Sequence, residues 1–379
     1  MTADFLYDRH ARHLARLASS ARRRRLIPEV GVDFASNDYL GLGRSGLLAE
    51  AARAALDRGV PVGSGGSRLL RGNCPEHEAL EAEAAAFFGS ESALWFATGY
   101  AANSALLSTL PQRGDLVVYD ELVHASAHEG MKLGRAETVA VRHNQVDAFD
   151  HAIRRWRAEG GMGTPWLAVE SLYSMDGDQA PLAALIEVAD RHDGVLLIDE
   201  AHATGVFGRD GRGLADTISD RENLITLRTC GKALGAEGAL VCGSAVVTDF
   251  LVNRGRGFIF STAPSPLMAA VVRAALGLVR DRPDLREALW TRVRQAETLL
   301  APLGAAVAGS QILPLIVGPD DRTMELAGAL QAAGYDVRGI RPPTVPNGTA
   351  RLRISITNNA ALADIEGLAA VLAEATAKA

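Results

Sequence analysis

The chain has 379 residues, a length typical of two or three domains. Its 39 basic and 45 acidic residues leave a formal net charge of −6, and 48% of its residues are apolar. These values exclude a disordered chain and give no electrostatic reason to expect binding to nucleic acid. The longest apolar stretch, residues 266–279, is shorter than a membrane-spanning helix and is broken by Arg273, so no membrane partner is expected either.

The three cysteines, Cys74, Cys230 and Cys242, lie far apart and form no Cys-x-x-Cys pair. This spacing excludes a disulfide framework and a thiolate zinc site. It is typical of a reducing compartment, and we therefore expect a cytoplasmic protein without a bound metal.

The N-terminal segment is strongly basic. Seven arginines and two aspartates in residues 1–25 sum to +5, which leaves −11 on the rest of the chain. Leu6, His13, Leu17 and Ala21 recur at helical spacing and predict a surface helix. An organelle transit peptide is the alternative, but such segments are rich in serine and poor in acids. No apolar region follows the start, as a secretory signal would require.

Short apolar runs alternate with helical stretches from about residue 45. The runs are rich in valine, leucine and isoleucine, which is typical of strands buried in a parallel sheet. We therefore predict an α/β fold with a mostly parallel central sheet and helices on both faces. The predicted helices include 47–56 and 76–88, and the predicted strands are 92–96, 116–119, 138–141, 166–170, 195–199 and 239–244.

The pattern changes after about residue 280. Helices are predicted at 284–300, 323–332 and 365–375, and strands at 312–317 and 350–357. Polar and apolar side chains alternate along the last of these strands, which predicts that it is half-buried. We expect a small C-terminal α+β domain with an antiparallel sheet at 281–379, a large domain at 45–280, and an N-terminal helix and arm at 1–44.

The most informative segment is an apolar strand that ends in Asp199-Glu-Ala-His202. An ionised carboxylate at the edge of a buried sheet needs a cation beside it. The cation is either Mg²⁺, as in a DEAH-type NTPase, or the protonated ring nitrogen of pyridoxal phosphate. An NTPase also needs a phosphate loop that ends in Gly-Lys followed by serine or threonine, but Ala233 follows the only Gly-Lys pair, Gly231-Lys232.

Pyridoxal phosphate requires a lysine for a Schiff base and a seat for its phosphate. Lys232 lies among small residues in a tight loop, where desolvation makes an amine nucleophilic. Gly99 and Tyr100 follow a predicted strand and open a helix, whose first N–H groups suit a phosphate. The pyridoxal interpretation therefore accounts for more of the sequence than the NTPase does.

Two more polar residues follow predicted strands. His124 can stack on a pyridine ring there, or it can be an ordinary core histidine. Ser174 can donate to the phenolic oxygen of the cofactor. The Asp-Gly-Asp run that comes after Ser174 lacks the spacing and the terminal glutamate of a calcium-binding loop.

Together these segments resemble the α-oxoamine synthases, pyridoxal-phosphate enzymes of fold type I, over nearly the whole chain. The matching segments are Ser36-Asn-Asp-Tyr-Leu-Gly-Leu, Gly63-Ser-Gly-Gly-Ser-Arg, Ser174-Met-Asp-Gly-Asp, Asp199-Glu-Ala-His-Ala-Thr-Gly and Thr229-Cys-Gly-Lys-Ala. Residues 340–353 are similar to the biotin-pathway branch of the family. That branch implies an acyltransferase that joins L-alanine to a pimeloyl thioester, on coenzyme A or on a carrier protein. Sibling enzymes that use glycine or serine with other acyl donors stay open.

The resemblance implies a role for each matching residue around the cofactor. Lys232 is expected to form the Schiff base, Asp199 to hold the pyridinium nitrogen, and His124 to stack on the ring. The other expected cofactor contacts are Ser174 and His202 at the phenolic oxygen, and Gly99, Tyr100 and Thr229 at the phosphate.

The resemblance also implies a second subunit and a substrate pocket. Ser261 and Thr262 match a segment that the partner subunit contributes in this family, so a homodimer with its active site at the subunit interface is expected. The expected substrate contacts are Arg341 for the carboxylate of the amino acid, Asn37, Thr344 and one arginine of the 22–25 run, for which we take Arg23.

Overall fold

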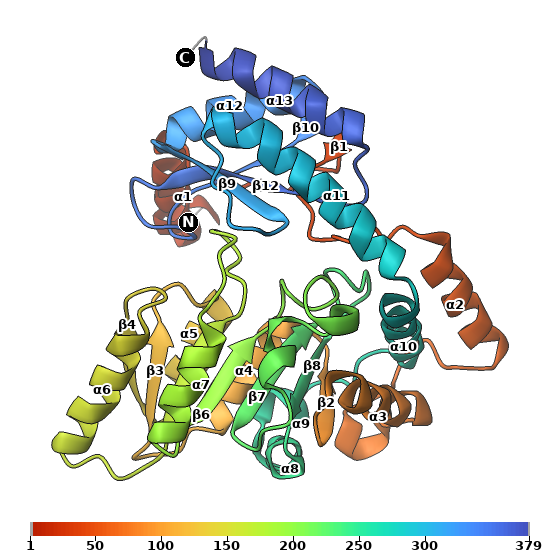
Figure 1. Ribbon diagram of the computed structural model, residues 1–379, viewed down its shortest axis with the longest axis vertical. Helices are drawn as coiled ribbons and strands as arrows, with labels where there is room; N and C mark the ends of the chain where they lie inside the picture. The colour runs from red at the N-terminus through yellow and green to blue at the C-terminus, as the bar shows by residue number, and fades with distance from the viewer. Residues whose placement is uncertain (1–2, 378–379) are drawn as a thin grey trace. The chain divides into compact units, whose positions relative to one another are not determined.

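The computed structural model describes residues 3–377 of the chain (Figure 1). These residues divide into two units. The large unit holds residues 37–174 and 178–287, and the small unit holds residues 3–36, 175–177 and 288–377. Each unit is built around a sheet of its own.

The large unit contains a seven-stranded sheet with the strand order β2-β8-β7-β6-β5-β3-β4. Among the described strands, β8 runs antiparallel to both of its neighbours, and the other six run in one direction. The prediction of a mostly parallel sheet is therefore confirmed. The strands are β2 (Ser92–Phe96), β3 (Leu116–Asp120), β4 (Glu137–Val141), β5 (Pro165–Glu170), β6 (Val195–Asp199), β7 (Leu224–Thr229) and β8 (Ala239–Gly243).

Helices cover both faces of this sheet (Figure 1). Leu196 and Ile198 of β6 belong to one apolar cluster, with α6 (Val146–Ala158) and α7 (Leu182–Arg191). Leu197 belongs to a second cluster, with α4 (Gly99–Thr109) and α5 (Ala125–Leu133). Because successive residues of a strand point to opposite faces, an uninterrupted apolar run is buried on both.

Local signals fix the ends of the remaining helices of the large unit. Ser45 caps the first turn of its helix by accepting from the N–H of Leu48, and Gly89 ends the next helix with a φ of +67°. The predicted helices at 47–56 and 76–88 are both present. The helices are α2 (Gly46–Asp57), α3 (Pro75–Phe88), α8 (Ala245–Arg254), α9 (Arg256–Ile259) and α10 (Pro266–Asp281).

Strand β7, which ends at Thr229, is absent from the sequence-based prediction. Its sequence, Leu-Ile-Thr-Leu-Arg-Thr, contains Arg228, and a charged residue is unusual in a buried strand. The structure supplies partners for it: the Arg228 guanidinium lies 3.0 Å from the buried carboxylate of Glu200 and over the ring of Phe88. A charge that is compensated in this way can occupy the interior.

The small unit contains a three-stranded antiparallel sheet, in the order β11-β12-β9, and a short pair of strands, β1 and β10. The predicted antiparallel sheet is confirmed. No helix within residues 3–377 has both the length and the hydropathy to cross a membrane. The elements are α1 (Ala3–Ser19), β1 (Val32–Asp33), α11 (Pro283–Leu300), β9 (Ile312–Gly318), α12 (Asp320–Ala332), β10 (Tyr335–Asp336), β11 (Arg338–Ile340), β12 (Ala350–Ser355) and α13 (Leu362–Ala377).

Two elements of the small unit differ from their predictions. The predicted surface helix at the N-terminus is present as α1, but it ends before Ala21, whose φ is +54°. The strand predicted at 350–357 is present as β12, but the prediction that it is half-buried is wrong, because every residue of β12 is buried. Arg351 is 3% exposed and forms an ion pair with Asp176, and Arg353 donates to Ser355 at 2.6 Å. Both arginines have partners inside the unit, so the polar positions of the strand do not face solvent.

Candidate active site

The carboxyl ends of β2, β3, β5, β6 and β7 lie at one edge of the large sheet, because these strands run in the same direction. This edge is where ligands bind in open α/β sheets. The structure brings eight of the predicted cofactor residues to it, each at the end of a strand or in the loop that follows: Gly99 and Tyr100 after β2, His124 after β3, Ser174 after β5, Asp199 and His202 at β6, and Thr229 and Lys232 at β7.

Asp199 is fixed by hydrogen bonds to both of its carboxylate oxygens. Asn103 of α4 donates from Nδ2 to Oδ2 at 2.7 Å, and the N–H of Ala201 donates to Oδ1 at 2.9 Å. Asp199 is 9% exposed and Asn103 is 2% exposed. Both donors are neutral groups, so these hydrogen bonds orient the carboxylate without pairing it with a charge of their own.

His202 is oriented by a buried tyrosine that the sequence analysis did not single out. The Tyr39 hydroxyl lies 2.6 Å from Nδ1 of His202 and donates to Oδ1 of Asn37 at 3.0 Å. Because a hydroxyl has one proton, this arrangement places a proton on Nδ1 of His202, which then donates to Tyr39. Asn37 therefore acts on the cofactor edge through Tyr39 and His202.

His124 precedes α5, and its ring lies at the same edge. Its Nδ1 is 2.8 Å from the Ser126 hydroxyl, and the ring of Tyr100 packs against it edge-on, with the centroids 6.5 Å apart. Desolvation and the charge of Lys232 lower the pKa of His124, although Asp199 opposes them. The imidazole is therefore neutral at neutral pH, which suits a ring that stacks on an aromatic ligand.

The start of α4 forms a close-packed cradle. Thr98 accepts from the N–H of Ala101 at 3.0 Å, and the first N–H groups of the helix have no acceptor within it. A Cβ on Gly99 would lie 2.6 Å from Cγ2 of Thr229. Glycine therefore lets the backbone approach Thr229 closely, and N–H groups at the start of a helix are of the kind that suits a phosphate.

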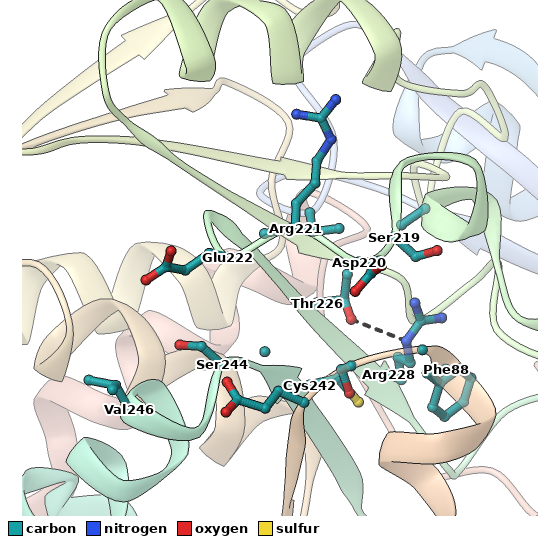
Figure 2. Close-up of a pocket in the computed structure, with 16 residues that line it drawn as sticks. Phe88, Ser219, Asp220, Arg221, Glu222, Thr226, Arg228, Cys242, Ser244 and Val246 are labelled. Atoms are coloured by element: carbon teal, nitrogen blue, oxygen red, sulfur yellow. Dashed lines mark hydrogen bonds between the residues drawn. The ribbon is translucent and has the colours of Figure 1, made fainter.

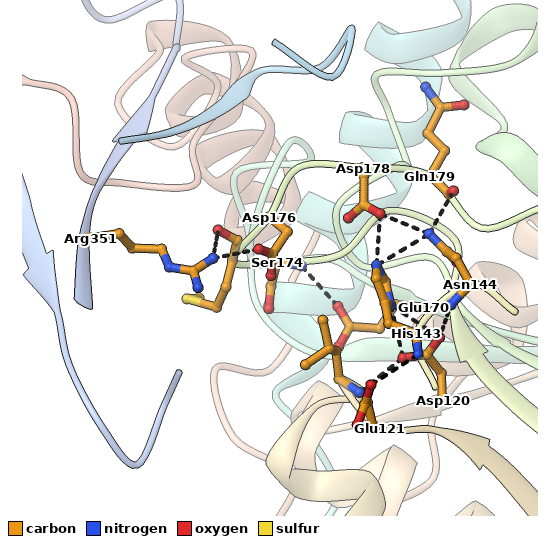
Figure 3. A network of polar contacts seen from close by, with 12 residues as sticks. Asp120, Glu121, His143, Asn144, Glu170, Ser174, Asp176, Asp178, Gln179 and Arg351 are labelled. Atoms are coloured by element: carbon orange, nitrogen blue, oxygen red, sulfur yellow. Dashed lines mark hydrogen bonds and ion pairs between the residues drawn. The ribbon is translucent and has the colours of Figure 1, made fainter. Parts of the chain in front are cut away.

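Ser174 lies on a hairpin loop that follows β5. The N–H of Tyr173 donates to the carbonyl of Asp178, and the N–H of Ala180 donates to the carbonyl of Ser171. The N–H of Ser174 itself donates to Oε2 of Glu170 at 3.1 Å (Figure 3). The backbone at Ser174 is therefore attached to the last residue of the strand.

A network centred on His143 holds the other side of the same loop (Figure 3). Nδ1 of His143 lies 3.0 Å from Asp120 at the end of β3, and Nε2 lies 2.7 Å from Asp178 on the loop. Asn144 also donates to Asp178, at 2.8 Å. The ring packs edge-on against Tyr173, with centroids 4.3 Å apart. His143 therefore connects the loop to the sheet.

The titration of this network follows from its geometry. Burial lowers the pKa of His143, but the two carboxylates outweigh it and raise the pKa to about 10. Burial raises the pKa of Asp120, yet hydrogen bonds from His143 and from the backbone leave it below its ordinary value. At neutral pH an imidazolium thus lies between two carboxylates.

The predicted substrate residues other than Asn37 lie in the small unit. Arg24 donates to the Thr344 hydroxyl at 3.0 Å, and Arg341 donates to the carbonyl of Ala21. Arg22 lies 2.6 Å from Asp320. Within this unit Arg24 is the arginine of the 22–25 run that contacts Thr344, and Arg23 as the arginine that meets substrate stays a prediction.

Ser261 and Thr262 are exposed in the large unit. The Ser261 hydroxyl donates to the carbonyl of Gly257 at 2.6 Å.

A cavity of about 540 Å³ lies at the opposite edge of the large sheet (Figure 2). Its lining includes Leu224, where β7 begins, and Gly243, where β8 ends. None of the residues predicted to bind cofactor or substrate contributes to its lining. This cavity is separate from the edge that collects the chemical groups.

Comparison with known proteins identifies the class. A family described as aminotransferase class I and II matches residues 29–372. A serine palmitoyltransferase from S. paucimobilis, solved with PLP and myriocin, superposes with a TM-score of 0.90 at 26% identity, over 100% of this chain and 99% of that one. The chain therefore belongs to the aminotransferase class I and II family, as a pyridoxal-phosphate-dependent acyltransferase of fold type I.

The relatives narrow the class further. The chain is 42% identical to a protein named 8-amino-7-oxononanoate synthase from Anaeromyxobacter dehalogenans, over 90% of this chain and 85% of that protein. A Chromobacterium violaceum protein of the same name is also 42% identical, over 89% and 87%. The solved 8-amino-7-oxononanoate synthase of Francisella tularensis covers 92% of this chain and 98% of its own, with a TM-score of 0.76 and 25% identity. The resemblance to the α-oxoamine synthases is confirmed.

The residues of this edge fit pyridoxal phosphate. The chemistry of the glycine cradle beside Thr229 is suited to a phosphate, and the fixed carboxylate of Asp199 is suited to a protonated ring nitrogen. Sequence reasoning missed Tyr39 and Asn103 as parts of this site, although Tyr39 lies in a segment that matched the family. Asn103 follows Gly99 by four residues on α4, and this spacing was the available signal.

Proposed function

We propose that the protein condenses L-alanine with a pimeloyl thioester, with loss of CO₂, to give 8-amino-7-oxononanoate for biotin synthesis. The observation that carries this proposal is the 42% identity to 8-amino-7-oxononanoate synthase over 90% of the chain. The acyl carrier is coenzyme A or a carrier protein. The three free cysteines are consistent with a cytoplasmic location.

The proposed roles follow from chemistry at the sheet edge. When bound, pyridoxal phosphate supplies an electron sink for negative charge at Cα of the amino acid. Lys232 would hold the cofactor through its amine, and the same amine would take the Cα proton of the amino acid. Asp199 keeps the ring nitrogen protonated, and the neutral ring of His124 covers one face of the cofactor.

The remaining contacts orient the cofactor and the substrate. In this proposal Nε2 of His202 and the Ser174 hydroxyl face the phenolic oxygen, and Arg341 pairs with the carboxylate of alanine. The phosphate is bound by Gly99, Tyr100 and Thr229. The substrate pocket is lined by Asn37 and Thr344. One arginine, Arg23 or Arg24, contacts the acyl donor or its product.

We also propose that the active enzyme is a homodimer. Ser261 and Thr262 are exposed on the chain, as residues must be if they complete the site of a second subunit. Substitution of both by alanine should then impair cofactor binding in mixed dimers as well as in the homodimer.

A serine-dependent sibling activity is the second candidate. The full-length superposition on serine palmitoyltransferase favours it, although the identity of 26% is well below that to the 8-amino-7-oxononanoate synthases. The test is to incubate the holoprotein with alanine, glycine or serine and with pimeloyl, acetyl, succinyl and palmitoyl thioesters. Thiol release together with the product mass expected from alanine and the pimeloyl donor supports the proposal. Turnover with only serine and palmitoyl thioester refutes it.

A further inference from the structure

Glu170 is a buried acid at the cofactor edge to which the proposed mechanism assigns no part. It is the last residue of β5 and is 3% exposed. In the parallel pairing of β5 with β6 it lies directly opposite Asp199. Because residues paired across neighbouring strands project from the same face, two carboxyl groups lie side by side at this edge.

The two carboxyl groups have unequal surroundings. Both oxygens of Asp199 accept a hydrogen bond, from Asn103 and from Ala201. Glu170 accepts one, at Oε2 from the N–H of Ser174, and Oε1 is buried without a hydrogen-bond partner in the described part of the chain. An ionised carboxylate in such a place is costly, whereas a protonated acid leaves little charge to solvate.

The surroundings of Glu170 on balance favour its protonated form. Burial is the main cause that raises its pKa, to about 8, and the charges of Asp199 and Asp120 add to it. Lys232 opposes them, and the N–H of Ser174 favours the ionised form. Two neighbouring carboxylates repel each other, and the repulsion is removed when one of them is protonated. Asp199 accepts more hydrogen bonds than Glu170 does, so Glu170 is the one expected to carry the proton.

We infer that Glu170 is a positioning residue that holds a proton at neutral pH, so that Asp199 carries the single negative charge beside the ring nitrogen while Oε2 holds the Ser174 loop. The proton is assigned to Oε1 because Oε2 accepts from the N–H of Ser174. A second negative charge at this edge would repel the negatively charged phosphate of the cofactor. The neutral form of Glu170 therefore binds the cofactor better than the ionised form does.

The direct test is infrared spectroscopy of the holoprotein across pH 7 to 9. A protonated carboxylic acid has a carbonyl stretch separate from the amide and carboxylate bands. We expect such a band at neutral pH in the wild type, its loss as the pH rises past about 8, and its absence from Glu170→Gln. Glu121→Gln removes an exposed carboxyl group near this edge, and it should keep both the band and its loss over the same pH range.

Cofactor release supplies a second measurement that does not depend on turnover. Release from the wild-type holoprotein should accelerate about threefold to tenfold between pH 7 and 9, as Glu170 ionises. Glu170→Gln should lose this acceleration relative to Glu121→Gln. A wild type without an acid band at neutral pH overturns the inference, and so does an unchanged acceleration in Glu170→Gln. Because the infrared titration needs only the wild type, a variant that fails to fold still leaves the inference testable.

Discussion

Replacement of His143 by glutamine should change how the stability of the protein depends on pH. In the native state both ring nitrogens face carboxylates, Asp120 at 3.0 Å and Asp178 at 2.7 Å. These contacts raise the pKa of His143 to about 10, whereas an unfolded chain has a histidine pKa of about 6.5. Glutamine can donate to one carboxylate but carries no charge.

The direction in which stability changes with pH depends on whether the folded or the unfolded state binds more protons at His143. Between about pH 6.5 and about pH 10 the folded protein binds one more proton at His143 than the unfolded chain does, so the free energy of unfolding falls as pH rises. The stabilisation is complete below about pH 6.5 and is lost as pH passes through about 10. One pKa unit corresponds to about 1.4 kcal/mol, so the full shift would be worth roughly 5 kcal/mol. The His143 side chain is 23% exposed, and screening by solvent reduces this to about 2–3 kcal/mol.

The assay is urea denaturation at intervals between about pH 7 and about pH 10, for wild type and His143→Gln. The wild type should lose about 2–3 kcal/mol more than the variant over this range. His192→Gln is the matched control, because His192 lies 2.9 Å from Asp150, which Arg154 and Arg191 already neutralise. It should keep the wild-type slope. Parallel curves for wild type and His143→Gln would refute the reasoning.

Three further substitutions test the cofactor edge. Lys232→Ala should lose the cofactor that borohydride traps covalently in the wild type, which mass spectrometry of the reduced protein detects. Asn103→Leu removes the 2.7 Å donor to Asp199 and should weaken cofactor binding about tenfold, measured by equilibrium dialysis. Tyr39→Phe removes a buried partner of His202 and should lower the free energy of unfolding by about 1–2 kcal/mol while it raises the rate of cofactor release. Unchanged cofactor affinity in Asn103→Leu would mean that Asp199 needs no neutral donor.

The sequence predicted the cofactor edge because the signal there is local. Asp199 ends an apolar run, and Lys232 follows the next strand in a loop of small residues. Once the strands are parallel, the ends of β3, β5 and β6 must share an edge. Lys232 was assigned to the same edge by the chemistry of the cofactor, because β7, the strand that precedes it, was not predicted.

The residues that sequence reasoning missed act through partners distant in the chain. Tyr39 and His202 are separated by 163 positions, and Asp120 and His143 by 23. Nothing in the local pattern around His143 distinguishes it from an exposed loop histidine. Its role depends on Asp178, which the hairpin after β5 carries back to it.

The predictions for β7 and β12 failed because the partners of their charged residues are distant in the chain. Arg228 interrupts the apolar pattern of β7, and Arg351 and Arg353 imitate the alternation of a half-buried strand in β12. Each has a partner within its unit, so each is buried. The periodicity of a sequence shows which side chains are polar. Whether a polar side chain is buried depends on whether the fold supplies a counter-charge or an acceptor for it.

Three neighbouring strands of the large sheet, β3, β5 and β6, end in an acid at the same edge: Asp120, Glu170 and Asp199. Three adjacent buried charges of one sign are unfavourable, and the structure resolves each differently. Asp120 has a cation of the protein's own, His143. Glu170 keeps its proton, in the inference drawn above. Asp199 receives hydrogen bonds from neutral donors, and in the proposed function a protonated pyridine nitrogen lies beside it as its counter-charge.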